Sequence, residues 1–86
     1  MARYRIDISQ SAERQLKKLG RDDQLRIVKA MLALAADPYP KGSRKLTGYE
    51  DVWRIRTGRF RILYSVSGKK LIIIILKIGR RKDVYR

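Results

Sequence analysis

The sequence predicts a single α+β domain, in which one strand and an antiparallel helical hairpin precede three further strands of the same sheet (β-α-α-β-β-β). Three observations predict this class. Residues 4–8 alternate apolar and polar side chains, residues 12–35 repeat apolar side chains at helical spacing, and residues 53–66 return to alternation. Because 86 residues is the length of one domain, we expect residues 1–86 to fold as one unit. The helical hairpin should cover one face of a mainly antiparallel four-stranded sheet.

The first strand and helix follow from residues 4–19. Apolar side chains at positions 4, 6 and 8 alternate with a charged residue at 5 and 7, the pattern of a half-buried strand. Ser9 or Ser11 can then cap a helix, whose apolar face would comprise Ala12, Leu16 and Leu19. We expect Gly20 to end this helix.

A second helix is predicted over residues 22–37. Asp22 and Asp23 favour its positive N-terminal end, and the pair Asp37-Pro38 ends it because the residue before a proline avoids the helical region. Its apolar stripe comprises Leu25, Val28, Leu32 and Ala35, widened by Ile27, Met31 and Leu34. The connection between the helices is so short that they must form an antiparallel hairpin.

The last three strands are predicted to form an antiparallel meander. Residues 53–57 and 60–66 alternate, with Gly58 in the turn between them, and residues 67–69 form a second turn. Residues 71–76 are apolar without alternation, which indicates a strand covered on both faces.

The net charge of +14 is concentrated in the second half of the chain. Residues 1–40 carry 8 basic and 5 acidic side chains, whereas residues 41–86 carry 14 basic and 3 acidic ones. Self-repulsion of this size opposes folding, so it indicates an anionic partner. Nucleic acid is the first candidate, followed by an acidic protein or a membrane surface.

Strand alternation places several arginines on one face. If Trp53 and Ile55 face the helices, the residues between and beside them face away. This open face would comprise Arg54, Arg56, Arg59 and Arg61, with Arg80 and Arg81 completing its rim. Trp53 itself is interpreted as core rather than as a base-stacking residue. Tyr85 lies beyond the last strand and is open to either role.

The composition excludes most familiar catalytic chemistry. The chain has no histidine and no cysteine, so it lacks the usual near-neutral acid–base residue and a thiolate metal site. Its carboxylates do not cluster, and no metal site or cofactor is predicted. No segment is apolar for long enough to span a membrane, and a cytoplasmic location without membrane contact is expected. RNA cleavage by the 2′-hydroxyl of the RNA itself remains available to a cationic face, although a passive nucleic-acid binder would look similar.

Three motifs carry a family resemblance: KLTG at Lys45–Gly48, VWRIRTGRFRILYSV at Val52–Val66, and the ending LKIGRRKDVYR. Together with the helix pair they resemble the RelE/ParE superfamily of type II toxins. RelE-like members are ribosome-dependent endoribonucleases that cut messenger RNA in the decoding site, whereas ParE-like members inhibit DNA gyrase. Arg81 and Tyr85 favour the RelE-like branch.

The resemblance implies a set of site residues. Arg61 and Arg81 would hold and neutralise the scissile phosphate, and Tyr85 would position a base or assist deprotonation of the 2′-hydroxyl. Arg56 stands where relatives often have lysine, and because arginine does not lose its proton its role would be electrostatic. The general base stays unassigned. Further RNA-binding positions are Lys45, Arg54, Arg59, Arg80 and Lys82.

The resemblance also implies partners. These would be a small, acidic cognate antitoxin, the ribosome and its messenger RNA, and operator DNA only through the toxin–antitoxin complex. Two alternatives to a ribosome-dependent endoribonuclease stay open. One is a gyrase inhibitor that does not cleave RNA, and the other is a basic RNA- or ribosome-binding module without catalysis.

Overall fold

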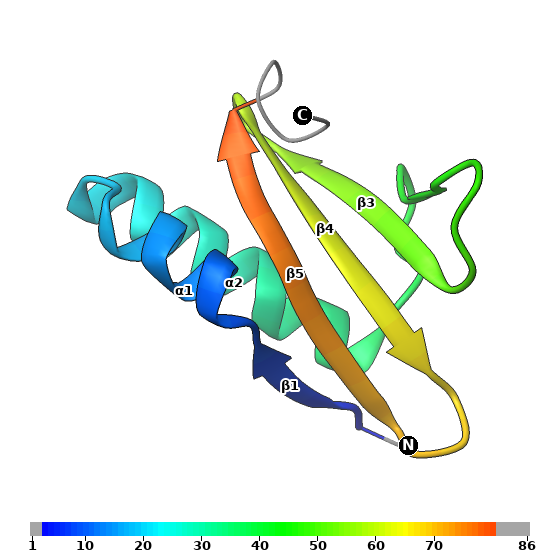
Figure 1. Cartoon of the computed structure of the whole chain (residues 1–86). Coiled ribbons are helices and arrows are strands. Elements are labelled where there is room, and N and C mark those ends of the chain that lie inside the picture. The colour runs from blue at the N-terminus through cyan, green and yellow to red at the C-terminus, as the bar shows by residue number, and fades with distance from the viewer. Residues whose placement is uncertain (1–2, 81–86) are drawn as a thin grey trace.

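A helical hairpin lies against one face of a mixed sheet in the computed structural model, which describes residues 3–80 (Figure 1). The elements in chain order are β1 (Arg5–Ile8), α1 (Gln10–Lys17), α2 (Arg21–Ala36), β2 (Arg44–Lys45), β3 (Val52–Thr57), β4 (Phe60–Ser67) and β5 (Ile72–Arg80). The strand order across the sheet is β1-β5-β4-β3-β2, with β1 parallel to β5 and the other pairs antiparallel. The predicted α+β fold is confirmed, and the two-residue strand β2 adds a fifth strand at one edge.

The helix ends show how short sequence signals set the hairpin. Ser9 caps α1, since its hydroxyl accepts a hydrogen bond from the Ala12 amide at 3.1 Å. The prediction that Gly20 ends α1 is wrong. Gly20 stands at the N-cap of α2 in an extended conformation. Helix α1 ends earlier, at Lys17, and the Leu16 carbonyl in its last turn accepts a hydrogen bond from the Gln24 side chain. Helix α2 ends before Asp37, as predicted.

The core lies between the helices and the inner face of the sheet. On β4 the predicted alternation places Phe60, Ile62, Tyr64 and Val66 in the core against the helices, and Leu63 is buried as well, on the other face of the strand. The largest fully buried side chains are Tyr64, Phe60, Ile27, Leu34, Ile62, Ile73, Ile75 and Ile78. The Tyr64 hydroxyl reaches the edge of this core and donates a hydrogen bond to the Pro38 carbonyl at 2.7 Å. Burial is the main cause that raises the pKa of Tyr64 to about 12.

Strand β5 contains an irregularity that changes which residues face the helices. Leu63 of β4 pairs with Lys77, but Tyr64 pairs with Ile75, so Leu76 is an extra residue in β5. As a result Ile75 and Ile78 both face the helices although two residues separate them, and Lys77 faces the other side.

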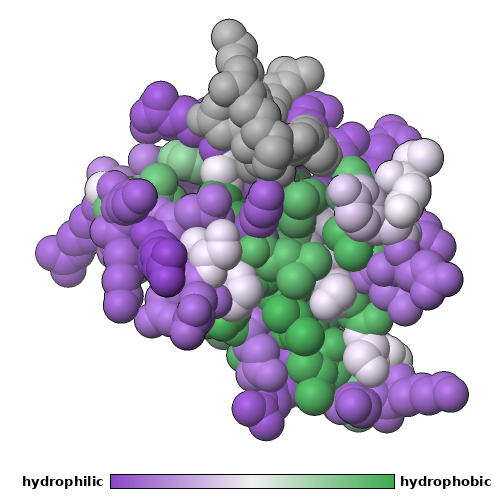
Figure 2. All heavy atoms as spheres, viewed as in Figure 1, coloured by the Kyte–Doolittle hydropathy of each residue, from purple (hydrophilic) through white to green (hydrophobic). Residues whose placement is uncertain are grey.

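The outer face of β5 is not covered by any element of the described chain. Ile74 pairs with Ser65 and is 39% exposed, so the prediction of a strand covered on both faces is wrong. An apolar band flanked by hydrophilic residues runs down this side of the molecule (Figure 2). Within residues 3–80 no helix is both long and apolar enough to cross a membrane.

Candidate nucleic-acid interface

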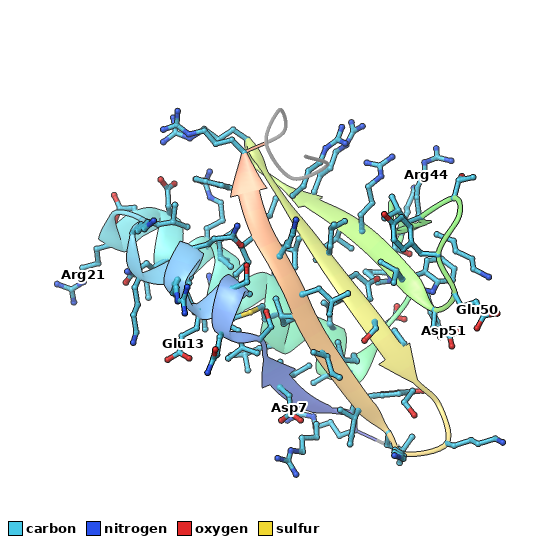
Figure 3. The ribbon with its side chains drawn as sticks, viewed as in Figure 1. Asp7, Glu13, Arg21, Arg44, Glu50 and Asp51 are labelled. Carbon is cyan, nitrogen blue, oxygen red and sulfur yellow. The ribbon has the colours of Figure 1, made fainter. Side chains whose placement is uncertain are left out.

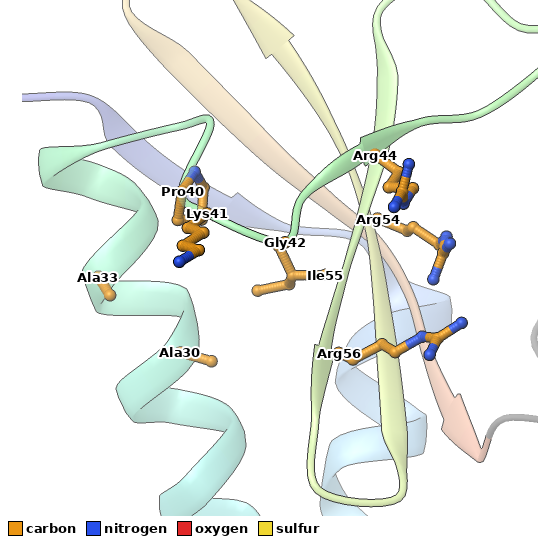
Figure 4. A pocket seen from close by; sticks show the side chains of 9 residues that line it. All are labelled: Ala30, Ala33, Pro40, Lys41, Gly42, Arg44, Arg54, Ile55 and Arg56. Carbon is orange, nitrogen blue, oxygen red and sulfur yellow. The ribbon is translucent and has the colours of Figure 1, made fainter.

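The face of the sheet opposite the helices carries a group of arginines from three strands. Arg56 of β3 pairs with Arg61 of β4, and Arg54 of β3 pairs with both Leu63 of β4 and Arg44 of β2. Paired residues share one face of a sheet. The pair between these arginines, Ile55 and Ile62, is buried against the helices, so the arginines face the other side. Figure 4 shows Arg44, Arg54 and Arg56 extending to one side, away from α2. The predicted orientation of Arg54, Arg56 and Arg61 is therefore confirmed.

Two basic residues of this face were not predicted. Arg44 belongs to β2, whose two residues are too few to show alternation. Lys77 faces the same side as Leu63 because of the irregularity in β5. We define the arginine face as Arg44, Arg54, Arg56, Arg61 and Lys77.

Arg59 does not belong to the arginine face, and the prediction that it faces away from the helices is wrong. It lies in the turn between β3 and β4, where strand alternation does not apply. Its guanidinium donates to the Asp23 carboxylate of α2 at 3.2 Å and lies 5.6 Å from the ring centroid of Phe60. This side chain connects the turn to the helical layer.

The other predicted residues are placed as follows. Arg80 is the last residue of β5 and pairs with Phe60, so it lies on the helix side of the sheet and not on the rim of the open face. Lys45 pairs with Trp53 and likewise faces the helix side, where it is exposed. Arg81, Lys82 and Tyr85 lie outside the described residues.

Gly58 fixes the turn that carries Arg56 and Arg61 on its two flanks. Its φ of +59° lies in the left-handed region, which a residue with a Cβ adopts at a cost. A Cβ at this position would also lie 2.6 Å from Nη1 of Arg26 in α2. The Arg26 side chain therefore lies directly over this turn, and a larger residue at position 58 would displace it.

The arginine face is suited to bind phosphate. Facing residues on neighbouring strands have Cβ atoms about 5 Å apart, so the guanidiniums of Arg56 and Arg61 can approach one phosphate from two strands. Each guanidinium can donate two parallel hydrogen bonds to an oxyanion.

The described part of this face supplies no obvious general base. Tyr64 of β4 faces the core, and both its raised pKa and its hydrogen bond to Pro38 keep it protonated. The labelled carboxylates extend outward from β1 (Asp7), from α1 (Glu13) and from the loop before β3 (Glu50 and Asp51) (Figure 3). Across residues 3–80, no group of three or more His, Cys, Asp and Glu residues is arranged to hold a metal ion.

A groove adjoins the arginine face between α2 and β3 (Figure 4). Its volume is about 520 Å³, and it is lined by Ala30 and Ala33 of α2, by the loop residues Pro40, Lys41 and Gly42, and by Arg44, Arg54, Ile55 and Arg56. Small side chains form one wall and cations the other. A phosphate-containing chain could therefore approach this edge without meeting a bulky helix surface.

Comparisons with known proteins agree with this fold. The profile of the family described as the ParE toxin of the parDE type II toxin–antitoxin system matches residues 6–85. The RelE1 protein of Methanocaldococcus jannaschii is 31% identical over 98% of this chain and 97% of its own. A RelE-like toxin protein of Escherichia coli is also 31% identical, over 96% of this chain and 90% of its own.

Solved structures show the same architecture. The archaeal RelE–RelB complex from Pyrococcus horikoshii contains a chain that superposes with a TM-score of 0.83, at 30% identity over 98% of this chain and 100% of that one. The E. coli RelBE toxin–antitoxin complex gives a TM-score of 0.79 at 23% identity, over 90% of this chain and 95% of that one, and shows likeness of fold. The chain therefore belongs to the RelE/ParE superfamily of type II toxin–antitoxin toxins and is RelE-like.

Proposed function

We propose that this RelE-like toxin cleaves messenger RNA in the ribosomal A site, by attack of the RNA 2′-hydroxyl on the adjacent phosphate. The observation that supports this proposal most is the pairing of Arg56 with Arg61 on the open face of the hairpin. Two guanidiniums on facing strands can hold the scissile phosphate and stabilise the charge that develops on it. Since RNA provides its own nucleophile, the protein needs to align the reacting groups more than to supply new ones.

The proposed roles follow from the chemistry of each side chain. Arg61 would bind the phosphate together with Arg81, and Arg81 would stabilise the negative charge that develops on the leaving 5′-oxygen. Arg56 would act through its charge, because a guanidinium remains protonated throughout the neutral range. Tyr85 would position a base or help deprotonate the 2′-hydroxyl, and the ribosome or solvent could supply the remaining base.

We also propose that a small acidic antitoxin binds this chain. The structures from P. horikoshii and E. coli are toxin–antitoxin complexes, and a chain of net charge +14 would associate rapidly with an acidic partner. By covering the arginine face, such a partner would keep the toxin from RNA.

The test is inducible expression of the toxin without its antitoxin, followed by mapping of message 5′ ends within minutes. We expect new ends within translated regions, arrested growth, and loss of both in the Arg61→Ala variant, whose cleavage rate should fall by about 100-fold or more. Arg59→Ala is the matched control, since Arg59 contacts Asp23 instead of the open face, and it should cleave much as the parent does. Intact messages in arrested cells would contradict the proposal.

A gyrase inhibitor is the second candidate, because the matching family profile is that of ParE toxins. Such an inhibitor would leave messages intact and accumulate cleaved DNA–gyrase complexes. The same induced cultures distinguish the two functions if DNA breaks and message ends are measured side by side.

A further inference from the structure

Tyr39 is an exposed aromatic residue at the edge of the sheet that none of the proposed catalytic roles uses. It follows Pro38 and precedes Pro40 in the loop after α2, and it is 47% exposed. One part of its ring contacts Trp53 of β3, with ring centroids 4.7 Å apart and planes inclined by 56°. The other part of the ring is open to solvent.

Three hydrogen bonds hold the loop that presents this ring. The Tyr39 amide donates to the Asp37 carboxylate at 3.0 Å. On either side, the Pro38 carbonyl accepts from the Tyr64 hydroxyl at 2.7 Å, and the Pro40 carbonyl accepts from the Ser43 amide at 2.9 Å. Pro38 and Pro40 each have a fixed φ, and Pro40 also restricts the backbone of Tyr39 before it. Tyr39 therefore has little conformational freedom left to lose on binding.

Both cations and carboxylates lie near this ring. Lys41 follows Tyr39 in the loop and lines the groove next to β3, whereas Arg44 belongs to the arginine face on the other side of the sheet. Burial raises the pKa of the Tyr39 hydroxyl, and the nearby charge of Asp51 adds to this effect. Lys45 pairs with Trp53 and lies on the same face of the sheet as the indole that Tyr39 contacts. An ordered aromatic ring beside exposed cations is the combination by which proteins bind single-stranded nucleic acid, with bases on the rings and phosphates on the cations.

We propose that Tyr39 stacks an unpaired base of single-stranded RNA, and that Lys41 and Lys45 bind the phosphates next to it. This site lies on the far side of β3 from the arginine face, so it extends the bound RNA around the edge of the sheet. The inference rests on the proposed function only in taking RNA as the ligand, and it does not require cleavage.

A purely structural role for Tyr39 would be to cover Trp53. A leucine could perform that role equally well, because covering an indole needs apolar area and not a π-system. Tyr49 provides a matched comparison. It is more exposed, at 62%, and it also lies near Lys45, but among the described residues no aromatic ring packs against it as Trp53 packs against Tyr39.

The experiment measures binding of a fluorescent 2′-O-methyl hexauridylate to the full-length chain by anisotropy over a range of KCl concentrations. The 2′-O-methyl groups prevent cleavage, so binding is measured whether or not the protein is an endoribonuclease. Trp53 is the only tryptophan of the chain, and its emission reports both folding and stacking next to Tyr39.

We expect Tyr39→Ala and Tyr39→Leu to weaken binding by about 5- to 100-fold, with the salt dependence unchanged because no phosphate contact is removed. Tyr39→Phe and Tyr49→Ala should bind as the parent does. In Lys45→Ala the plot of log association constant against log salt concentration should become less steep, by about 0.7, because one phosphate contact is lost. RNA should change the Trp53 emission of the parent and of Tyr39→Phe.

Parental affinity in Tyr39→Leu would overturn the inference, and so would an equal loss in Tyr49→Ala. A Tyr39 effect seen with hexathymidylate but not with the RNA analogue would overturn RNA as the ligand. Because Tyr39→Leu still covers Trp53, a folding defect confined to Tyr39→Ala does not obscure the result. Failure of the cleavage experiment above would leave Tyr39-dependent binding intact, so the two proposals can fail separately.

Discussion

The two faces of the β3–β4 hairpin differ sharply although neighbouring residues of the same two strands build them. Ile55 and Ile62 pair on the inner face and are buried by the helices, while Arg56 and Arg61 pair one position further along on the outer face. Burial of apolar area on the inner face favours folding, whereas the guanidiniums on the outer face can bind an anion. Apolar side chains that stabilise the fold and cations that can bind phosphate therefore alternate along each strand.

Substitution of adjacent residues on opposite faces is the strongest test of this difference. Ile62→Ala should reduce the free energy of unfolding by about 2–5 kcal/mol, because it leaves a cavity in a fully buried site. Arg61→Ala should change it by much less and in either direction, since it removes a half-buried contact but also a like-charge repulsion. Urea denaturation followed by Trp53 fluorescence measures both. Similar losses in the two variants would show that the faces do not divide these roles.

Gly58 stands where the two faces meet at the end of the hairpin. Gly58→Ala should cost about 1–2 kcal/mol, because alanine is strained at a φ of +59° and its Cβ displaces the Arg26 side chain. Gly68→Ala in the other hairpin turn is the control, since it has neither a positive φ nor a close contact. Equal thermal midpoints for the two variants would contradict a special role for Gly58.

The hydroxyl of Tyr64 is the one polar group at the margin of the core whose pKa is raised strongly among the described residues. Tyr64→Phe should cost about 1–2 kcal/mol at pH 8, because the Pro38 carbonyl loses its donor. The folded-state pKa of about 12 exceeds the usual value of 10, so the unfolded chain loses this proton first. The parent should thus lose stability above pH 10, and the gap between parent and Tyr64→Phe should narrow by pH 11. A constant gap between the two pH values would contradict the raised pKa.

The smallest effect is expected for the ion pair between Asp23 and Arg59. Asp23→Asn should reduce stability by less than about 1 kcal/mol, because the Arg59 side chain is mostly exposed and water screens the pair. This difference should vanish at high salt, which denaturation in 0.05 and 1 M KCl would measure. A salt-independent loss would indicate that the contact acts through packing of the turn.

Much of the fold could be predicted because its signals are local. Alternation along β3 and β4 predicted the facing of Arg54, Arg56 and Arg61, and the pair Asp37-Pro38 predicted the end of α2. The errors have non-local causes. The side chain of Arg59 does not follow the alternation of the strands, because it belongs to a turn and contacts Asp23 of α2.

The candidate site was less predictable than the fold. Arg44 was missed because its strand exists only through pairing with β3, and Lys77 because its facing depends on an extra residue in β5. Tyr39 was not predicted as a site residue, since nothing in the sequence shows that it contacts Trp53. A signal was nevertheless present in the two prolines beside it, which restrict the backbone of an aromatic residue in a cationic segment.

The extra residue in β5 has a consequence for how the chain can change over time. Leu76 has no partner in β4, so a chain without it would still place Lys77 opposite Leu63 and Ile78 opposite Ile62. Ile78 would stay in the core, and the charge of Lys77 would stay on the outer face. The strand can therefore lose one residue at this point without inverting its two faces, and related chains should vary here in length as well as in residue identity.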